Sequence, residues 1–150
     1  MRTKSVERSF RSTPAALRAI RDFIRQKAKK AHLNSREAED FVLAVSEAAT
    51  NAVVHADTSE ILVAWTRSGA RIEICVADRG VFKHRIPTPE RTDVGGRGIP
   101  IMVALMDDVT LSPGTQERPG TVIRLTKHLR TGTAGAHSPP GGPLAKVRSS

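Results

Sequence analysis

The feature that most constrains the fold is the segment 34–55, whose pattern requires a helix covered on one side by the rest of the domain. Its apolar residues recur at the three- and four-residue spacing of a helix face. They are Ala38, Phe41, Val42, Val45, Ala48, Ala49 and Ala52. Asn34 and Glu37 have the spacing of a capping box, which predicts that the helix starts near Asn34. It is expected to end near His55.

The same segment carries a row of polar residues within the sequence SEAATNAVVHA (46–56). Glu47, Asn51 and His55 are four residues apart, so they lie on one face of the helix. The amide oxygen of Asn51 is a hard ligand that suits Mg²⁺, and Glu47 can accept a proton from an attacking hydroxyl group or water. A solvated polar face explains the row equally well when the row is taken alone.

The rest of the chain alternates strand and helix patterns. Runs rich in β-branched residues predict strands at 61–65, 71–78, 108–112 and 121–129, with a further edge strand at 6–10. A first helix is expected from Pro14, with Thr13 as its cap, and a short one from Ile99 to Leu105. This order predicts an α+β fold, a two-layer sandwich of a mixed, mainly antiparallel sheet with helices on one face.

Length and composition predict one domain in residues 1–130 of the 150. Residues 131–150 are rich in Gly, Pro, Ser and Ala, and we expect them to form a disordered C-terminal tail. The lone cysteine, Cys75, cannot form an internal disulfide and is expected to be a buried structural thiol, which favours a reducing cytoplasm. No apolar run approaches the length of a membrane helix, so no membrane partner is expected.

The net charge of +9 raises the possibility of nucleic-acid binding. The basic residues crowd into the first 36 positions, and no zinc-finger spacing or aromatic RNA-binding motif accompanies them. Direct binding of nucleic acid is therefore not the favoured interpretation. A solvated basic face or a docking surface for an acidic protein explains the charge as well.

Two further motifs extend the polar row into a nucleotide site. At the end of the strand 71–78, Asp78 can accept a hydrogen bond from an adenine amino group, and Gly80 permits close approach of a flat base. Gly96, Arg97 and Gly98 precede a helix, where backbone N–H groups can point at phosphate oxygens. Each motif alone is also explained as a turn or a hinge. Together the three supply the parts of an ATP–Mg²⁺ site, and the loop 79–98 can close over the nucleotide.

These residues resemble a known family. SEAATNAVVHA resembles the N box of the gyrase, chaperone and histidine-kinase ATPase superfamily, and VADRG and GGRGIPIM resemble its two glycine boxes. The segment GTVIRLTKHL (120–129) is similar to the closing strand of that fold. The compact length points to the RsbW/SpoIIAB-like anti-sigma factors with serine-protein kinase activity. The resemblance covers residues 5–130.

The resemblance implies a role for each matching residue. It makes Glu47 the general base, Asn51 the Mg²⁺ ligand and Asp78 the reader of adenine. It places Gly80 in the first glycine box, Thr121 in support of the adenine pocket and His55 at the pocket edge. Gly96, Arg97 and Gly98 fall on the second glycine box, with Gly96 and Gly98 lining the phosphates. Two positions depart from the family pattern: Phe82 replaces a glycine of the first box, and Pro100 stands in the second.

The resemblance also implies partners. Members of this branch phosphorylate a Ser or Thr of an anti-anti-sigma protein with a STAS domain, bind a sigma factor, and are commonly homodimers. The leading hypothesis is therefore an ATP-dependent protein serine/threonine kinase and anti-sigma factor that regulates transcription by partner switching. The alternative is a non-catalytic nucleotide-binding module that sequesters a sigma factor or another regulator.

Overall fold

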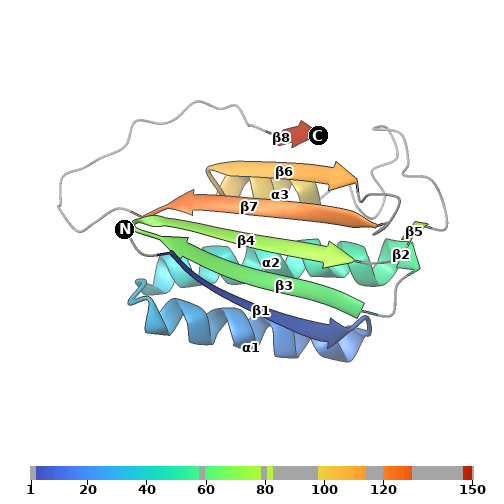
Figure 1. Ribbon diagram of the computed structural model, residues 1–150, viewed down its shortest axis with the longest axis horizontal. Helices are drawn as coiled ribbons and strands as arrows, with labels where there is room; N and C mark the ends of the chain where they lie inside the picture. The colour runs from blue at the N-terminus through green and yellow to red at the C-terminus, as the bar shows by residue number, and fades with distance from the viewer. Residues whose placement is uncertain are drawn as a thin grey trace.

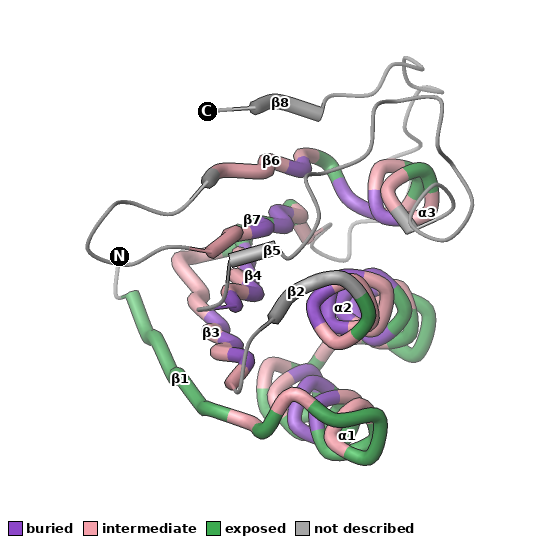
Figure 2. The backbone as a smooth tube through the Cα atoms, turned by 90° about the vertical axis from the view of Figure 1, so that its right-hand side faces the viewer, coloured by how far each residue is buried: buried purple, intermediate pink, exposed green. Residues whose placement is uncertain are grey.

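The computed structural model describes residues 3–57, 60–78, 81–82, 98–113, 120–129 and 147–149. The elements in chain order are β1 (Thr3–Arg11), α1 (Pro14–Lys30), α2 (Ser35–His55), β2 (Ala56–Asp57), β3 (Glu60–Ser68), β4 (Arg71–Asp78), β5 (Val81–Phe82), α3 (Gly98–Leu105), β6 (Asp108–Pro113), β7 (Thr121–His128) and β8 (Val147–Ser149). The large sheet forms one layer, and the three helices cover one of its faces, with α2 between α1 and α3 (Figure 2). The predicted α+β sandwich is confirmed.

The large sheet has the strand order β1-β3-β4-β7-β6-β8, so β4 is a central strand (Figure 1). The pairs β1–β3, β3–β4, β4–β7 and β6–β7 are antiparallel, and β6–β8 is parallel. The sheet is therefore mixed and mainly antiparallel, as the sequence predicts. A second, two-stranded sheet pairs β2 with β5, two strands that the sequence patterns do not predict.

Strand β8 lies within the segment 131–150, which the sequence predicts to be a disordered tail. Val147–Ser149 pairs in parallel with β6 at the edge of the sheet. The edge of a sheet presents unpaired N–H and C=O groups, and an extended segment can satisfy them whatever its composition. The other residues of the predicted tail lie outside the described part of the chain, so the boundary at residue 130 stays a prediction.

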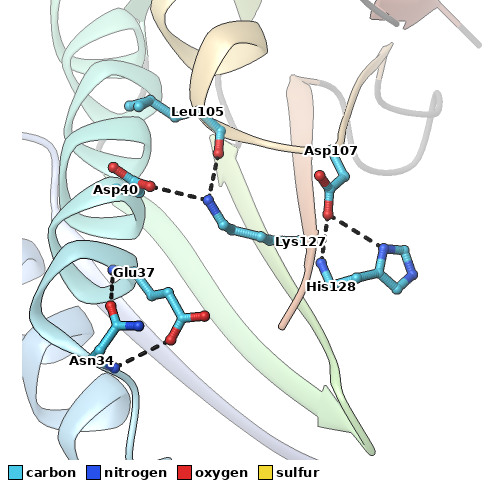
Figure 3. A network of polar contacts seen from close by, with 7 residues as sticks. All are labelled: Asn34, Glu37, Asp40, Leu105, Asp107, Lys127 and His128. Atoms are coloured by element: carbon cyan, nitrogen blue, oxygen red, sulfur yellow. Dashed lines mark hydrogen bonds and ion pairs between the residues drawn. The ribbon is translucent and has the colours of Figure 1, made fainter. Parts of the chain in front are cut away.

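Both long helices begin where the sequence predicts. Thr13 Oγ1 accepts a hydrogen bond from the Ala16 amide at 3.3 Å, and Pro14 opens α1. Asn34 and Glu37 form the reciprocal capping box, with 2.8 Å from the Glu37 amide to Asn34 Oδ1 and 3.2 Å from the Asn34 amide to Glu37 Oε1 (Figure 3). Such caps contribute about 1 kcal/mol each, so they determine helix starts locally.

The core lies between the sheet and the helices. Alternate residues of β3 and β4 are buried, which places one side of each strand against the helix layer. The small residues Ala48, Ala49 and Ala52 of α2 are buried as well and allow α2 to lie close to β4. Phe41 of α2 packs against Trp65 of β3 with ring centroids 5.6 Å apart. Among the described helices, none is long and apolar enough to span a bilayer.

Candidate nucleotide-binding site

Helix α2 places Glu47 and Asn51 at the boundary of its buried face. The neighbouring Ala48 and Ala52 are fully buried, whereas Glu47 and Asn51 are only partly buried. At about 100° per residue, the polar pair therefore lies beside the apolar stripe and stays accessible to a ligand. His55 is the last residue of α2, and its side chain lies outside the described part of the structure.

Asp78 ends the central strand β4 and faces the helix layer. It follows Ile72, Ile74 and Val76 in a row of alternate residues, all of them buried, and Asp78 itself is only 7% exposed. The carboxyl group therefore extends an apolar row at the end of the sheet. A carboxylate at this place can accept hydrogen bonds from a bound base, as the sequence motif predicts.

Thr121 and Gly120 adjoin Asp78. Thr121, the first residue of β7, is paired in register with Asp78, and alternation along β7 puts Thr121 on the side of the buried Ile123 and Leu125. Gly120 has φ +131°, and a Cβ atom built on it would lie 2.1 Å from the Asp78 carbonyl oxygen and 2.9 Å from Asp78 Oδ1. Only glycine fits where the chain enters β7 so close to Asp78.

A short sheet holds the end of α2 beside the segment that follows Asp78. Ala56 and Asp57, directly after His55, pair antiparallel with Phe82 and Val81. Strand β2 directly follows the polar row of α2, and strand β5 follows the first glycine motif. The hydrogen bonds between β2 and β5 therefore link the two segments. This link is not predicted by the sequence, because strands of two residues have no periodicity that a pattern could reveal. The link also gives Phe82, a departure from the family pattern, a place in a strand.

Helix α3 packs against α2, and a partly buried ion pair anchors the C-terminal end of α3. Lys127 Nζ of β7 lies 3.1 Å from Asp40 Oδ2 of α2 and donates to the Leu105 carbonyl oxygen at 3.0 Å (Figure 3). The Leu105 end of α3 is therefore next to the N-terminal half of α2. The helix runs antiparallel to α2, so Gly98 lies toward the half of α2 that carries Glu47 (Figure 1).

The remaining predicted residues fall largely outside the described ranges. Arg79, Gly80, Gly96 and Arg97 lie there, and so does most of the predicted closing loop 79–98. Gly98 is described only as the first residue of α3.

The donor set of the site fits a weakly ligated Mg²⁺. Among the residues that the structure describes, no group of three or more His, Cys, Asp and Glu side chains could hold a metal ion. Mg²⁺ often binds through one or two protein oxygens, substrate phosphates and water instead. Asn51 offers such an oxygen, with a carboxylate one helical turn away at Glu47.

Cys75 lies away from this site, on the other side of β4. It is partly buried, and burial raises the pKa of its thiol, while the nearby Arg124 guanidinium opposes that rise. A thiol with a raised pKa carries little thiolate at neutral pH. The structure thus favours the interpretation of Cys75 as a structural thiol.

Comparison with known proteins agrees with this geometry. A family model, the histidine kinase-like ATPase domain, matches residues 10–127. The chain belongs to the histidine kinase-like ATPase domain family. Within the family it is similar to the serine-protein kinase RsbW of Bacillus pumilus, with 35% identity over 111 residues, which are 62% of this chain and 66% of that protein. The predicted resemblance to the RsbW-like branch is confirmed.

A second relative and a solved structure are also similar to the chain. An anti-sigma F factor of Heyndrickxia coagulans is 36% identical over 98 residues, which are 57% of this chain and 65% of that protein. A crystal structure of the RsbU and RsbW domains of Rv1364c from Mycobacterium tuberculosis has a TM-score of 0.66 at 23% identity, over 84% of this chain and 32% of that one, and shows the same fold. The chain spans slightly less than two thirds of the length of the relatives from Bacillus pumilus and Heyndrickxia coagulans.

Proposed function

We propose that the protein is an ATP-binding anti-sigma factor with serine/threonine-protein kinase activity toward an anti-anti-sigma partner of the STAS type, and that it regulates transcription by partner switching. One observation carries the proposal. The partly buried pair Glu47 and Asn51 on α2 and the register pair Asp78 and Thr121 in the sheet belong to one helix–sheet unit, joined at one end by the β2–β5 pairing. The names of the similar proteins support the activity.

The sheet residues would bind the base of ATP. Asp78 accepts a hydrogen bond from the adenine amino group and disfavours guanine, which presents an acceptor oxygen at that position. Thr121 supports the same pocket from the neighbouring strand, and Gly80 allows the base to lie close to the backbone. His55 stands at the pocket edge. Gly96, Arg97 and Gly98 line the phosphates ahead of α3, where backbone N–H groups favour negative charge.

The helix residues would carry the chemistry. Glu47 takes the proton from the Ser or Thr hydroxyl of the protein substrate, and its partial exposure lets that hydroxyl reach it. Asn51 holds Mg²⁺, which when bound neutralises phosphate charge. Phosphoryl transfer depends mainly on such positioning and charge neutralisation. The protein would act in the cytoplasm, bind a sigma factor when it is not bound to the STAS partner, and form a homodimer.

Labelled ATP tests this proposal. The protein is incubated with labelled ATP, Mg²⁺ and a candidate STAS protein, and both ATP binding and label transfer are measured. Glu47→Ala is expected to abolish transfer and keep ATP binding, and Asn51→Ala is expected to lose the Mg²⁺-dependent part of binding. Glu39→Ala is the matched control, because Glu39 is an exposed glutamate of the same helix whose contact with Arg25 is at the surface.

Each outcome separates the two hypotheses that the sequence left open. Transfer to the STAS protein that Glu47→Ala removes supports the kinase. Binding of ATP without transfer supports the binding module that sequesters a sigma factor. Full kinase activity in Asn51→Ala would contradict the metal assignment, and absence of ATP binding in the unaltered protein would overturn both hypotheses.

A further inference from the structure

A basic groove lies between β1 and the C-terminal half of α1. Its volume is about 610 Å³, within the range of ligand pockets. Lys4 and Val6 of β1 form one wall, Lys27 and Lys30 of α1 form the other, and Trp65 and Arg67 of β3 lie between them. We call this feature the β1–α1 groove. Figure 2 shows that the backbone of β1 comes nearest to α1 toward the C-terminal end of β1.

The groove is separate from the candidate nucleotide site. Arg67 pairs with Lys4, whereas Asp78 pairs with Ile61 at the opposite end of β3. Arg67 lies six positions along β3 from Ile61, or about 20 Å at about 3.3 Å per residue. A ligand in the groove therefore contacts none of the residues proposed to bind ATP.

The charges that line the groove favour an anionic ligand. Four of its lining side chains are cationic, and none of the described lining residues is acidic. Arg67 is held in place, since its Nε donates to the Gly69 carbonyl and its Nη1 to the Ala31 carbonyl, both at 3.0 Å. Such a concentration of positive charge in a concave site attracts negatively charged ligands.

The groove also offers an apolar surface. Val6 is 39% exposed, one of the few large apolar side chains that the described structure leaves in water. Trp65 lies at the floor, with 4% of its surface exposed. A ligand that combines negative charge with apolar groups would therefore match this lining.

We propose that the β1–α1 groove binds an acidic peptide segment of a partner protein, extended along β1, with carboxylates among apolar side chains. Strand β1 ends the described sheet, so a peptide can pair with its outer edge and direct alternate side chains into the groove. Trp65 is too buried to stack on a nucleic-acid base, which disfavours single-stranded nucleic acid. A second copy of β1 does not fit, because Lys4, Arg8 and Arg11 outnumber Glu7 and would repel their counterparts.

A model peptide tests the proposal without knowledge of the partner. A short peptide in which Glu and Leu alternate is titrated into the full chain, and Trp65, the only tryptophan, reports on the groove through its emission. Anisotropy of a labelled copy of the peptide gives the affinity. A peptide in which Lys and Leu alternate serves as the control ligand. We expect binding of the acidic peptide alone, a change of Trp65 emission, and weaker binding at high salt.

Charge reversal locates the binding. Lys27→Glu/Lys30→Glu is expected to weaken the affinity about tenfold or more, because rim charges of complementary sign are replaced by repulsive ones. Lys4→Glu/Lys30→Glu should do the same while Lys27 keeps its place over the Phe23 ring at 5.8 Å. The matched control Lys29→Glu/Arg36→Glu makes the same change in net charge at exposed positions outside the groove lining and should bind normally.

Three results would overturn the proposal. The first is failure of the acidic peptide to bind, and the second is an equal loss of affinity in the control variant. The third is that a single-stranded oligonucleotide or phosphatidylserine vesicles bind more strongly than the peptide and lose that binding in the same groove variants. ATP affinity, measured in parallel, should be unchanged by all three double variants. The groove and the proposed kinase activity are thereby tested independently.

Discussion

Gly120 is the position at which one added methyl group should weaken both the fold and nucleotide binding. Its φ of +131° is a backbone conformation that other residues rarely adopt, and its missing side chain leaves room for the carbonyl oxygen of Asp78. In Gly120→Ala the new Cβ would lie 2.1 Å from that oxygen, so the backbone of β4 or of the turn before β7 must move. The two residues that would move, Asp78 and Thr121, are the pair proposed to hold adenine.

The size of the effect follows from two costs. A non-glycine residue in a sparsely populated backbone region costs about 1–3 kcal/mol. Relief of an overpacked contact costs about 1–3 kcal/mol more. We therefore expect Gly120→Ala to lower the free energy of unfolding by about 2–6 kcal/mol. Displacement of Asp78 should weaken ATP binding about tenfold or more, which corresponds to about 1.4 kcal/mol.

Urea unfolding measures the first effect, and calorimetric titration with ATP measures the second, under conditions in which the variant is folded. Gly69→Ala is the matched control. Gly69 also has a positive φ, 62°, but lies in the turn between β3 and β4, at the opposite end of the strands from Asp78. The control should lose about 1–2 kcal/mol of stability and keep its ATP affinity. Unchanged ATP affinity in Gly120→Ala would refute the placement of the adenine site at Asp78.

Two further predictions concern groups outside the nucleotide site. Lys127→Met removes the donor shared by Asp40 and the Leu105 carbonyl and should lower the free energy of unfolding by about 1–3 kcal/mol; a urea-unfolding loss below about 0.5 kcal/mol, the size typical of exposed ion pairs, would contradict this. Cys75 should react with iodoacetamide more slowly than a free cysteine, because burial raises the pKa of its thiol. Arg124→Gln should slow this reaction further, because the Arg124 guanidinium, which lowers the thiol pKa, is then absent. The folded state holds the thiol proton more tightly than the unfolded chain, so stability should fall as pH rises above the unfolded thiol pKa; alkylation as fast as that of a free thiol would contradict the reasoning.

The starts of both long helices could be predicted from the sequence because they depend on neighbours. Thr13, Pro14, Asn34 and Glu37 cap their helices through contacts within three residues, and such contacts form whatever the rest of the chain does. The position of Glu47 and Asn51 beside the buried stripe of α2 follows from the helical period in the same way. The apolar residues Ile72, Ile74 and Val76 alternate along β4, so the buried side of that strand also follows from a local pattern.

Some features of the site depend on residues that are far apart in the chain. The link between β2 and β5 leaves no pattern in two residues, and nothing around Lys127 indicates that its ammonium group joins Asp40 to α3. The edge strand β8 was missed because its pairing with β6 satisfies backbone groups and does not require an apolar pattern.

By itself, the sequence determined the class of fold, the faces of the helices and strands, and the residue types of a nucleotide site. The tertiary structure alone decided that Thr121 pairs with Asp78 and that the Gly120 backbone lies against the Asp78 carbonyl. Local patterns act over a few residues, whereas strand register depends on how the whole sheet is assembled. The same reason explains the β1–α1 groove, whose basic residues come from β1, α1 and β3 and form one surface only after folding.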